Sequence, residues 1–231
     1  MKPLGQRVFG KSHAGLEIQA NRYGTGQLSV LLIGGVHGDE SEGFIFTERF
    51  ESELSRDKIK LPEEVVLNVC ARLNPDGCKA NRRTNHRNVD LNRNMPTKDW
   101  IGDFTNVRYY PGPHGGSESE NQALLAMIQE TRPSLILSLH SYEHPMVNFN
   151  GESEDLGKAM SERNGLPAKG DIGYPTPGSL GTYAGWERNI PTITLEILRG
   201  QDPETVWSTH LSGVELAIGY YLNHQLPRRK G

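Results

Sequence analysis

The chain has 231 residues, a formal net charge of −3 and a sequence pI of about 6.2. This length suits one α/β unit with a sizeable core, so we expect residues 1–231 to form a single domain. The charge balance gives no sign of a nucleic-acid-binding surface, and no apolar run approaches the roughly 18 residues of a membrane span. The first ten residues lack the apolar core of a secretion signal, so we expect a cytoplasmic protein. Cys70 and Cys78 are then expected to be free thiols.

Apolar periodicity predicts alternating strands and helices along the chain. The first half of the chain predicts a hairpin at residues 7–23, a buried strand at 29–34, a helix at 41–54, a second strand at 64–73 and a tight turn at 74–77. The second half predicts a helix at 117–131 that starts at a capping box (Ser117 and Glu120), followed by strands at 134–139 and 146–149. It then predicts helices at 154–164 and 180–188, a strand at 191–198 and a closing helix at 203–222. The alternation favours an α/β fold with a mixed, mostly parallel central sheet and helices on both faces.

Two histidines and a glutamate follow apolar strands of this predicted sheet. His37 and Glu40 stand within one short turn after the strand at 29–34, and His140 follows the strand at 134–139. Because ligands of open α/β sheets bind at the carboxyl ends of the strands, these side chains are expected to meet there. Two His and one Glu with an open fourth position form a catalytic zinc set, so we expect one Zn²⁺ per chain. Taken singly, each motif also fits a solvated turn or a structural histidine.

A further unusual residue is Glu196, a charged side chain inside the apolar strand at 191–198. A buried carboxylate without a partner is costly, whereas a neighbouring Zn²⁺ or Arg would make its burial tolerable. Such a Glu can take a proton from water and then give it to a leaving amine. The alternative is an edge strand on which Glu196 points to solvent.

Residues 78–116 form a long polar segment with little periodicity, rich in Arg, Asn, Tyr and Gly. Loops of this length inside a compact domain are usually functional. Arg83 and Arg93 can bind carboxylates through paired hydrogen bonds, and Asn92 adds a neutral donor. Asp90 is a candidate acceptor for the N–H group of a metal-ligating His. A solvated basic loop is the alternative interpretation.

Taken together and in this order, the motifs resemble those of the zinc metallocarboxypeptidases. The resemblance runs from about Val30 to Leu198 and is carried by His37-x-x-Glu40, Asn74-Pro75-Asp76-Gly77, Arg83, Asp90-Leu91-Asn92-Arg93-Asn94, His140 and Thr194-Leu195-Glu196. It implies a zinc carboxypeptidase-like fold and a single catalytic domain. It also implies that zinc is held by His37, Glu40 and His140, and that Glu196 is the general base and then the general acid.

The same resemblance implies roles in substrate binding. Arg83 would stabilise the oxyanion, whereas Asn92 and Arg93 would clamp the terminal α-carboxylate of a peptide. Tyr174 resembles the mobile tyrosine that closes over the substrate. One departure is Asp39, which stands between two zinc ligands where digestive members carry a basic residue. This departure argues against a digestive type of peptide specificity.

Within this family, the likeness is closest to bacterial amidases of cell-wall recycling. It is carried by four local sequences, at residues 37–40, 74–78, 116–118 and 173–179. These amidases cleave the γ-D-glutamyl–meso-diaminopimelate bond of murein tripeptide in the cytoplasm. We therefore expect this small peptide as the partner, and neither nucleic acid nor membrane. No pattern in the sequence indicates an oligomeric state.

Two other functions stay open at this point. The first is a zinc-dependent deacylase of N-acyl amino acids, resembling aspartoacylase or succinylglutamate desuccinylase, which share an H-G-x-E turn and an Asn-Arg pair. The turn at 74–77 and the loop at 176–179 favour the carboxypeptidase interpretation over this one. The second is a non-catalytic peptide-binding module on the same fold, which loss of a ligand or of Glu196 would indicate.

Overall fold

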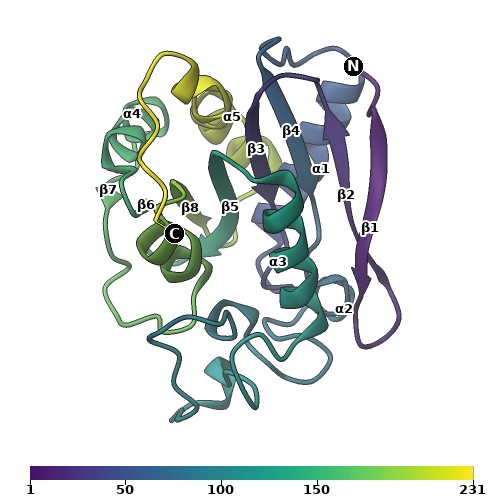
Figure 1. The fold of residues 1–231 in the computed structure, drawn as a ribbon, viewed down its shortest axis with the longest axis vertical. Coiled ribbons are helices and arrows are strands. Elements are labelled where there is room, and N and C mark those ends of the chain that lie inside the picture. Colours follow the sequence, from purple (N-terminus) through teal and green to yellow (C-terminus); the bar gives the residue numbers. More distant parts are fainter. Residues whose placement is uncertain (231) are drawn as a thin grey trace.

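The computed structural model describes residues 1–230 and contains an eight-stranded mixed sheet with helices on both faces (Figure 1). The strands are β1 (Gly5–Lys11), β2 (Glu17–Tyr23), β3 (Leu28–Ile33), β4 (Val65–Cys70), β5 (Leu135–Tyr142), β6 (Met146–Asn150), β7 (Ala168–Lys169) and β8 (Thr192–Leu198). They lie in the order β1-β2-β4-β3-β5-β8-β6-β7, and the central strands β4, β3, β5 and β8 are parallel. The predicted fold class is confirmed.

The helices pack on both faces of the sheet because its central strands are apolar on both sides. The α-helices are α1 (Ser41–Ser55), α2 (Pro75–Ala80), α3 (Ser119–Thr131), α4 (Glu154–Asn164) and α5 (Pro203–Gly219). In β3, Val30 and Leu32 enter the core that α1, α4 and α5 cover, whereas Leu31 and Ile33 enter the core under α3 (Figure 1). Within residues 1–230, no helix has the length and apolar character needed to cross a bilayer.

The expected tight turn at Asn74–Gly77 is instead the start of helix α2. The side-chain oxygen of Asn74 accepts a hydrogen bond of 2.9 Å from Gly77 N and so caps the helix. Pro75 occupies the first turn, where its missing N–H group leaves no hydrogen bond unmade. Asn, Pro and Asp favour turns and helix starts alike, which makes this local pattern ambiguous.

The predicted capping box at the start of α3 is wrong. The helix begins at Ser119, and its N-cap residue is Glu118 rather than Ser117. The hydroxyl of Ser117 donates a hydrogen bond of 2.6 Å to Glu118 Oε1, and Glu118 is fully buried. The buried carboxylate therefore takes the hydroxyl that would otherwise cap the first turn.

Three further boundaries differ from those expected. Strand β5 continues to Tyr142, so His140 lies inside the strand rather than after it, because β8 supplies pairing partners along this length. The helix expected at 180–188 is a π-helix at Gly181–Trp186. The closing helix ends earlier than expected, and one 3₁₀ turn at Tyr220–Leu222 follows α5.

The long segment between α2 and α3 gathers at one end of the sheet and is held there by buried amides (Figure 1). Asn85 Nδ2 donates to Glu118 Oε2 at 2.8 Å and to Glu120 Oε2 at 3.0 Å. Asn94 Nδ2 donates to the carbonyl oxygens of Pro111 and His114, at 2.7 and 2.9 Å. Two 3₁₀ turns lie in this segment, at Leu91–Arg93 and Val107–Tyr109. These bonds give a polar loop the fixed conformation that a binding site needs.

Cys70 and Cys78 are both buried and carry free thiols. Burial raises the pKa of each thiol to about 12, so both stay protonated at neutral pH. Because the thiolate is the reactive form, neither cysteine is set up for chemistry.

Candidate active site

A cavity of about 490 Å³ lies at the carboxyl ends of the parallel strands β3, β5 and β8. Most of the predicted site residues line it, namely His37, Glu40, Arg83, Asn92, Arg93, His140, Tyr174 and Glu196. Asp90 is fully buried and lies behind His37. The sheet order changes direction here, because β4 and β5 flank β3 on opposite sides. Ligands of open α/β sheets bind at such switch points.

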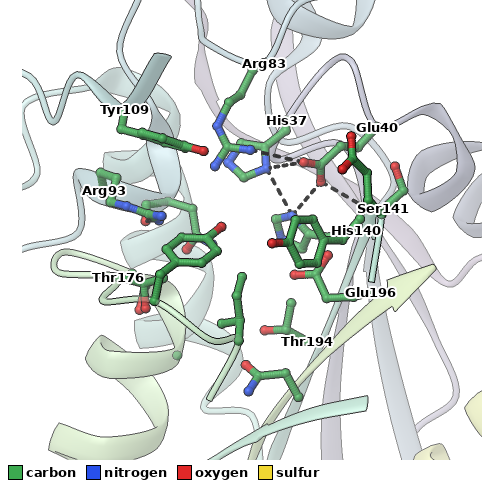
Figure 2. A pocket seen from close by; sticks show the side chains of 18 of the residues that line it. His37, Glu40, Arg83, Arg93, Tyr109, His140, Ser141, Thr176, Thr194 and Glu196 are labelled. Carbon is green, nitrogen blue, oxygen red and sulfur yellow. Dashed lines mark hydrogen bonds and ion pairs between the residues drawn. The ribbon is translucent and has the colours of Figure 1, made fainter. Parts of the chain in front are cut away.

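His37, Glu40 and His140 converge inside this cavity (Figure 2). Nδ1 of His37 lies 2.9 Å from Glu40 Oε1, and Nδ1 of His140 lies 2.8 Å from Glu40 Oε2. The two Nδ1 atoms are 3.2 Å apart. All three side chains are buried, so each directs a potential ligand atom toward one enclosed point.

The hydrogen bonds of the two imidazole rings fit a cation between them. Nε2 of His37 lies 2.9 Å from Asp90 Oδ1, and Nε2 of His140 lies 3.0 Å from Ser138 Oγ. With the Nε2–H groups donating outward, both Nδ1 atoms present lone pairs to each other and to the Glu40 carboxylate. Such a donor set repels itself unless a cation lies at its centre. The ligand atoms of a tetrahedral Zn²⁺ lie about 3.3 Å apart, close to the spacings found here.

The turn that carries His37 and Glu40 packs directly on helix α2. Gly38 N donates a hydrogen bond of 3.0 Å to Arg82 O. A Cβ atom on Gly38 would lie 1.9 Å from the carbonyl carbon of Gly77, so only glycine permits this contact. The glycine that follows His37 therefore fixes the turn against the rest of the site.

Arg83 joins two buried carboxylates beside this cluster. Its Nε and Nη2 atoms each lie 2.9 Å from Asp90 Oδ2, and its Nη1 atom lies 3.2 Å from Glu40 Oε1. Burial alone would raise the pKa of Asp90, but Arg83 and His37 outweigh it and hold this pKa well below its usual range. When their rings carry a proton at Nδ1 in place of a cation, His37 and His140 likewise lower the pKa of Glu40 against the effect of burial. Both carboxylates are therefore anionic at neutral pH.

Glu196 lies beside His140, because the two residues are register partners on the parallel strands β8 and β5 (Figure 2). Its side chain is 7% exposed, and no hydrogen bond or ion pair to its carboxylate is formed by residues 1–230. Burial, together with the negative charge of Glu40, raises the pKa of Glu196 to about 7, against the lowering effect of His140. A carboxyl group that titrates near neutrality can both take up and release a proton.

Arg93 is only 6% exposed, yet it forms no ion pair with any carboxylate of residues 1–230. Its Cζ atom lies 5.4 Å and 5.9 Å from the ring centroids of Tyr109 and Tyr174. Asn92 Oδ1 accepts a hydrogen bond of 2.9 Å from Leu180 N, which leaves the Asn92 amide nitrogen as a donor in the cavity wall. A buried cation without a counter-charge is costly, so this part of the cavity is suited to a substrate anion.

Comparison with known proteins agrees with this geometry. A family model described as zinc carboxypeptidase, peptidase M14, matches residues 1–201. The chain belongs to the zinc carboxypeptidase family. The predicted family and the predicted enzyme class, a hydrolase, are confirmed, and the non-catalytic binding module is excluded.

Relatives and solved structures of this zinc carboxypeptidase include cell-wall amidases. Murein peptide amidase A of Vibrio campbellii is 32% identical over 180 residues, which cover 72% of this chain and 68% of the relative. Murein peptide amidase A of Escherichia coli strain K12 is 32% identical over 180 residues, covering 73% and 70%. Murein-tripeptide amidase MpaA from Escherichia coli O157 has a TM-score of 0.78 at 25% identity and covers 99% of this chain and 95% of its own. Carboxypeptidase A from Helicoverpa armigera shares the fold, with a TM-score of 0.78 at 18% identity over 95% of this chain and 68% of its own.

The cavity of this zinc carboxypeptidase also contains residues that sequence motifs did not single out. They are Arg108, Tyr109, Tyr142, Asn148, Asn150 and Arg199. Tyr142 stands two residues after His140, and Arg199 stands three residues after Glu196. Their closeness in sequence to these candidate site residues could have predicted that they line the same cavity. Arg108 and Tyr109 come from the long loop, whose path no local pattern predicts.

Tyr174 lies among aromatic rings at the mouth of the site. Its ring centroid is 6.5 Å from that of Tyr109 and 6.4 Å from that of Tyr142. The loop that carries it is tied to the arginine segment, because a Cβ atom on Gly178 would lie 2.2 Å from Arg93 O. Gly178 also has a φ of +72°, a backbone conformation that residues with a Cβ atom rarely adopt. The structure thus brings Tyr174 to the same cavity as Arg93.

Proposed function

We propose that this zinc carboxypeptidase hydrolyses the γ-D-glutamyl–meso-diaminopimelate amide bond of murein tripeptide. The two relatives named murein peptide amidase A, and the likeness to murein-tripeptide amidase MpaA, support this substrate class. The observation that carries the proposal is the buried guanidinium of Arg93, which lacks a carboxylate partner within residues 1–230 and shares a cavity with Glu196. This arrangement suits a peptide that has a free α-carboxylate next to its scissile bond.

In this proposal His37, Glu40 and His140 hold one zinc ion. When bound, Zn²⁺ supplies Lewis acidity that polarises the scissile carbonyl and makes water more acidic. Asp90 and Ser138 accept the Nε2–H groups of the two histidines and so fix both rings with Nδ1 directed inward.

The remaining chemistry belongs to the chain's own residues. Glu196 takes a proton from the attacking water and gives it to the amide nitrogen of diaminopimelate as the C–N bond breaks. The products are L-Ala-D-Glu, with a new γ-carboxylate, and free diaminopimelate. Arg83 donates toward the carbonyl oxygen as negative charge develops on it. Arg93 and Asn92 hold the α-carboxylate of the leaving residue.

One wall of the cavity is polar, which supports a substrate with a polar side chain. Asn148, Asn150 and Thr194 line this wall. Asn150 Nδ2 donates to Asn148 Oδ1 at 3.1 Å, and Asn148 Nδ2 donates to Lys169 O at 3.0 Å. The distal end of diaminopimelate carries an ammonium and a carboxylate, and both can hydrogen-bond to such a wall. A large apolar side chain would leave these polar groups unpaired.

Hydrolysis of L-Ala-γ-D-Glu-meso-diaminopimelate tests the proposal. Mass spectrometry of the products made by the zinc-loaded protein should show L-Ala-D-Glu and diaminopimelate. A chelator should abolish this reaction, and added zinc should restore it. Hydrolysis of N-acetylaspartate or another N-acyl amino acid, with none of the tripeptide, would instead establish the deacylase.

The contact with Arg93 predicts an order of substrates. The tripeptide should be hydrolysed fastest, and the tetrapeptide, in which D-Ala occupies the α-carboxyl next to the scissile bond, more slowly. A tripeptide amidated at the diaminopimelate α-carboxylate next to the scissile bond should be nearly inert. The reason is that a hydrogen bond to a charged group contributes about 1.5–3 kcal/mol, and its loss leaves a buried guanidinium unpaired. The values of kcat/KM for the three peptides measure this order.

Arg93→Ala should flatten the difference between the free and the amidated tripeptide. We expect kcat/KM for the free acid to fall by about 10- to 100-fold, with little change for the amide. Arg87→Ala is the matched control, because Arg87 belongs to the same loop and its side chain is 48% exposed. That variant should keep the wild-type order. Equal rates on free and amidated tripeptide in the wild type would contradict anchoring of the carboxylate.

A further inference from the structure

Asp39 contacts two arginines that the reaction described above does not use. Nη2 of Arg108 lies 3.1 Å from Asp39 Oδ2, and Nη1 of Arg199 lies 3.4 Å from the same atom. Nη2 of Arg199 also donates to Glu40 Oε1 and to Ser141 O, each at 3.3 Å. Both arginines line the active-site cavity, so two cations from separate segments meet beside a candidate metal ligand.

These two guanidinium groups carry more positive charge than their partners neutralise. They share the carboxylate of Asp39, and Glu40 is shared with Arg83 as well. The side chain of Arg108 is 44% exposed, and Asp39 is the one carboxylate of residues 1–230 that pairs with it. The remaining N–H groups of Arg108 are free donors at the cavity wall. An anion bound here would gain both opposite charge and directed hydrogen bonds.

The position of the arginines relative to Arg93 decides which part of the substrate they face. Figure 2 shows Arg93 and Ser141 on opposite sides of the candidate metal ligands. Arg199 contacts Ser141, so it lies on the side away from Arg93. With the leaving residue held at Arg93, the acyl residue of the substrate extends toward Arg199 and Arg108.

We propose that Arg108 and Arg199 form a subsite for a carboxylate on the acyl residue of the substrate. A γ-linked glutamyl residue carries a free α-carboxylate on this side of the scissile bond, whereas an ordinary α-linked residue with a neutral side chain carries no carboxylate there. The subsite therefore favours γ-glutamyl acyl groups over acyl residues that lack a free carboxylate, an inference that rests on the proposed function and deepens it. Asp39 then has a role of its own, because it brings together arginines from two distant segments.

The test compares two tripeptides that differ only at the glutamyl α-carboxylate, as free acid and as carboxamide. For the zinc-loaded wild type, kcat/KM for the free acid should exceed that for the carboxamide by about tenfold, the lower end for a hydrogen bond to a charged group. Arg108→Gln should remove this preference, mainly by raising KM for the free acid. Arg87→Gln makes the same charge change on the same loop and should keep the preference. Arg199 is left intact because its contact with Glu40 links it to the metal ligands.

Equal wild-type values of kcat/KM for both peptides, or an equal loss for both in Arg108→Gln, would overturn the subsite. Calorimetric binding of L-Ala-D-Glu and of its α-carboxamide separates this outcome from failure of the proposed reaction. Suppose that the tripeptide is not hydrolysed, yet the dipeptide acid binds more tightly than its amide and loses that advantage in Arg108→Gln. The proposed function then fails and the subsite stands. Equal binding of the two dipeptides to the wild type overturns the subsite whether or not the tripeptide is cleaved.

Discussion

Glu196→Gln is expected to lower kcat by about 10²- to 10⁴-fold, the usual contribution of a general acid–base group. The amide keeps the size of the side chain but can neither accept the proton from water nor donate it to the leaving amine. Because Glu196 accepts no hydrogen bond from residues 1–230 and the amide keeps its size, its replacement breaks no hydrogen bond and opens no cavity. Zinc content and Tm should therefore stay close to the wild-type values, as measured by elemental analysis and calorimetry.

The matched control for this variant is Glu143→Gln. Glu143 lines the same cavity but is exposed, and it is not a register partner of His140. Its replacement therefore makes the same charge change without altering the carboxylate beside His140. We expect kcat within a few-fold of the wild type for this control. If Glu196→Gln also keeps activity within a few-fold, Glu196 is a buried structural carboxylate and its catalytic role is wrong.

His140→Ala is expected to abolish tight zinc binding and, with it, hydrolysis. Three side chains converge on one point, and removal of one leaves two donors with a gap between them. Loss even of a group that only orients a ligand typically lowers metal affinity 10- to 100-fold, so loss of the ligand itself should exceed about 100-fold. Elemental analysis after dialysis and a zinc titration of the metal-free protein measure this effect.

His144→Ala is the control for metal binding, because His144 lies four residues further on and is exposed. This variant should keep one zinc per chain and wild-type hydrolysis. Full zinc occupancy in His140→Ala would refute the ligand assignment.

Local sequence was sufficient to find the strands at the centre of the sheet and the polar residues at their ends. A strand covered on both faces must be apolar throughout, so the run at Val30–Ile33 stands out, and polar residues directly after it mark an edge of the sheet. His37 and Glu40 follow this strand within one turn. Glu196 was conspicuous for the same reason, as a charge inside a buried strand.

Boundaries were predicted less well, because tertiary partners set them. Strand β5 extends past His140 since β8 pairs with it as far as Tyr142. The hydroxyl of Ser117 binds the buried Glu118 side chain rather than the first turn of α3. The residue types at Asn74–Gly77 suit a turn and a helix start equally, so only the path of the following chain distinguishes the two.

By itself, therefore, the sequence predicted the α/β class and the family, which are confirmed, and it named the residues that we propose to hold zinc and carry out hydrolysis. Only the tertiary structure decided that His140 and Glu196 stand side by side and that the buried Arg93 lacks a carboxylate partner within residues 1–230. It also decided that Asp39 meets Arg108 and Arg199, which are 69 and 160 positions away. Local patterns report on neighbours within a few residues, whereas these contacts depend on strand order, register and the packing of a long polar loop.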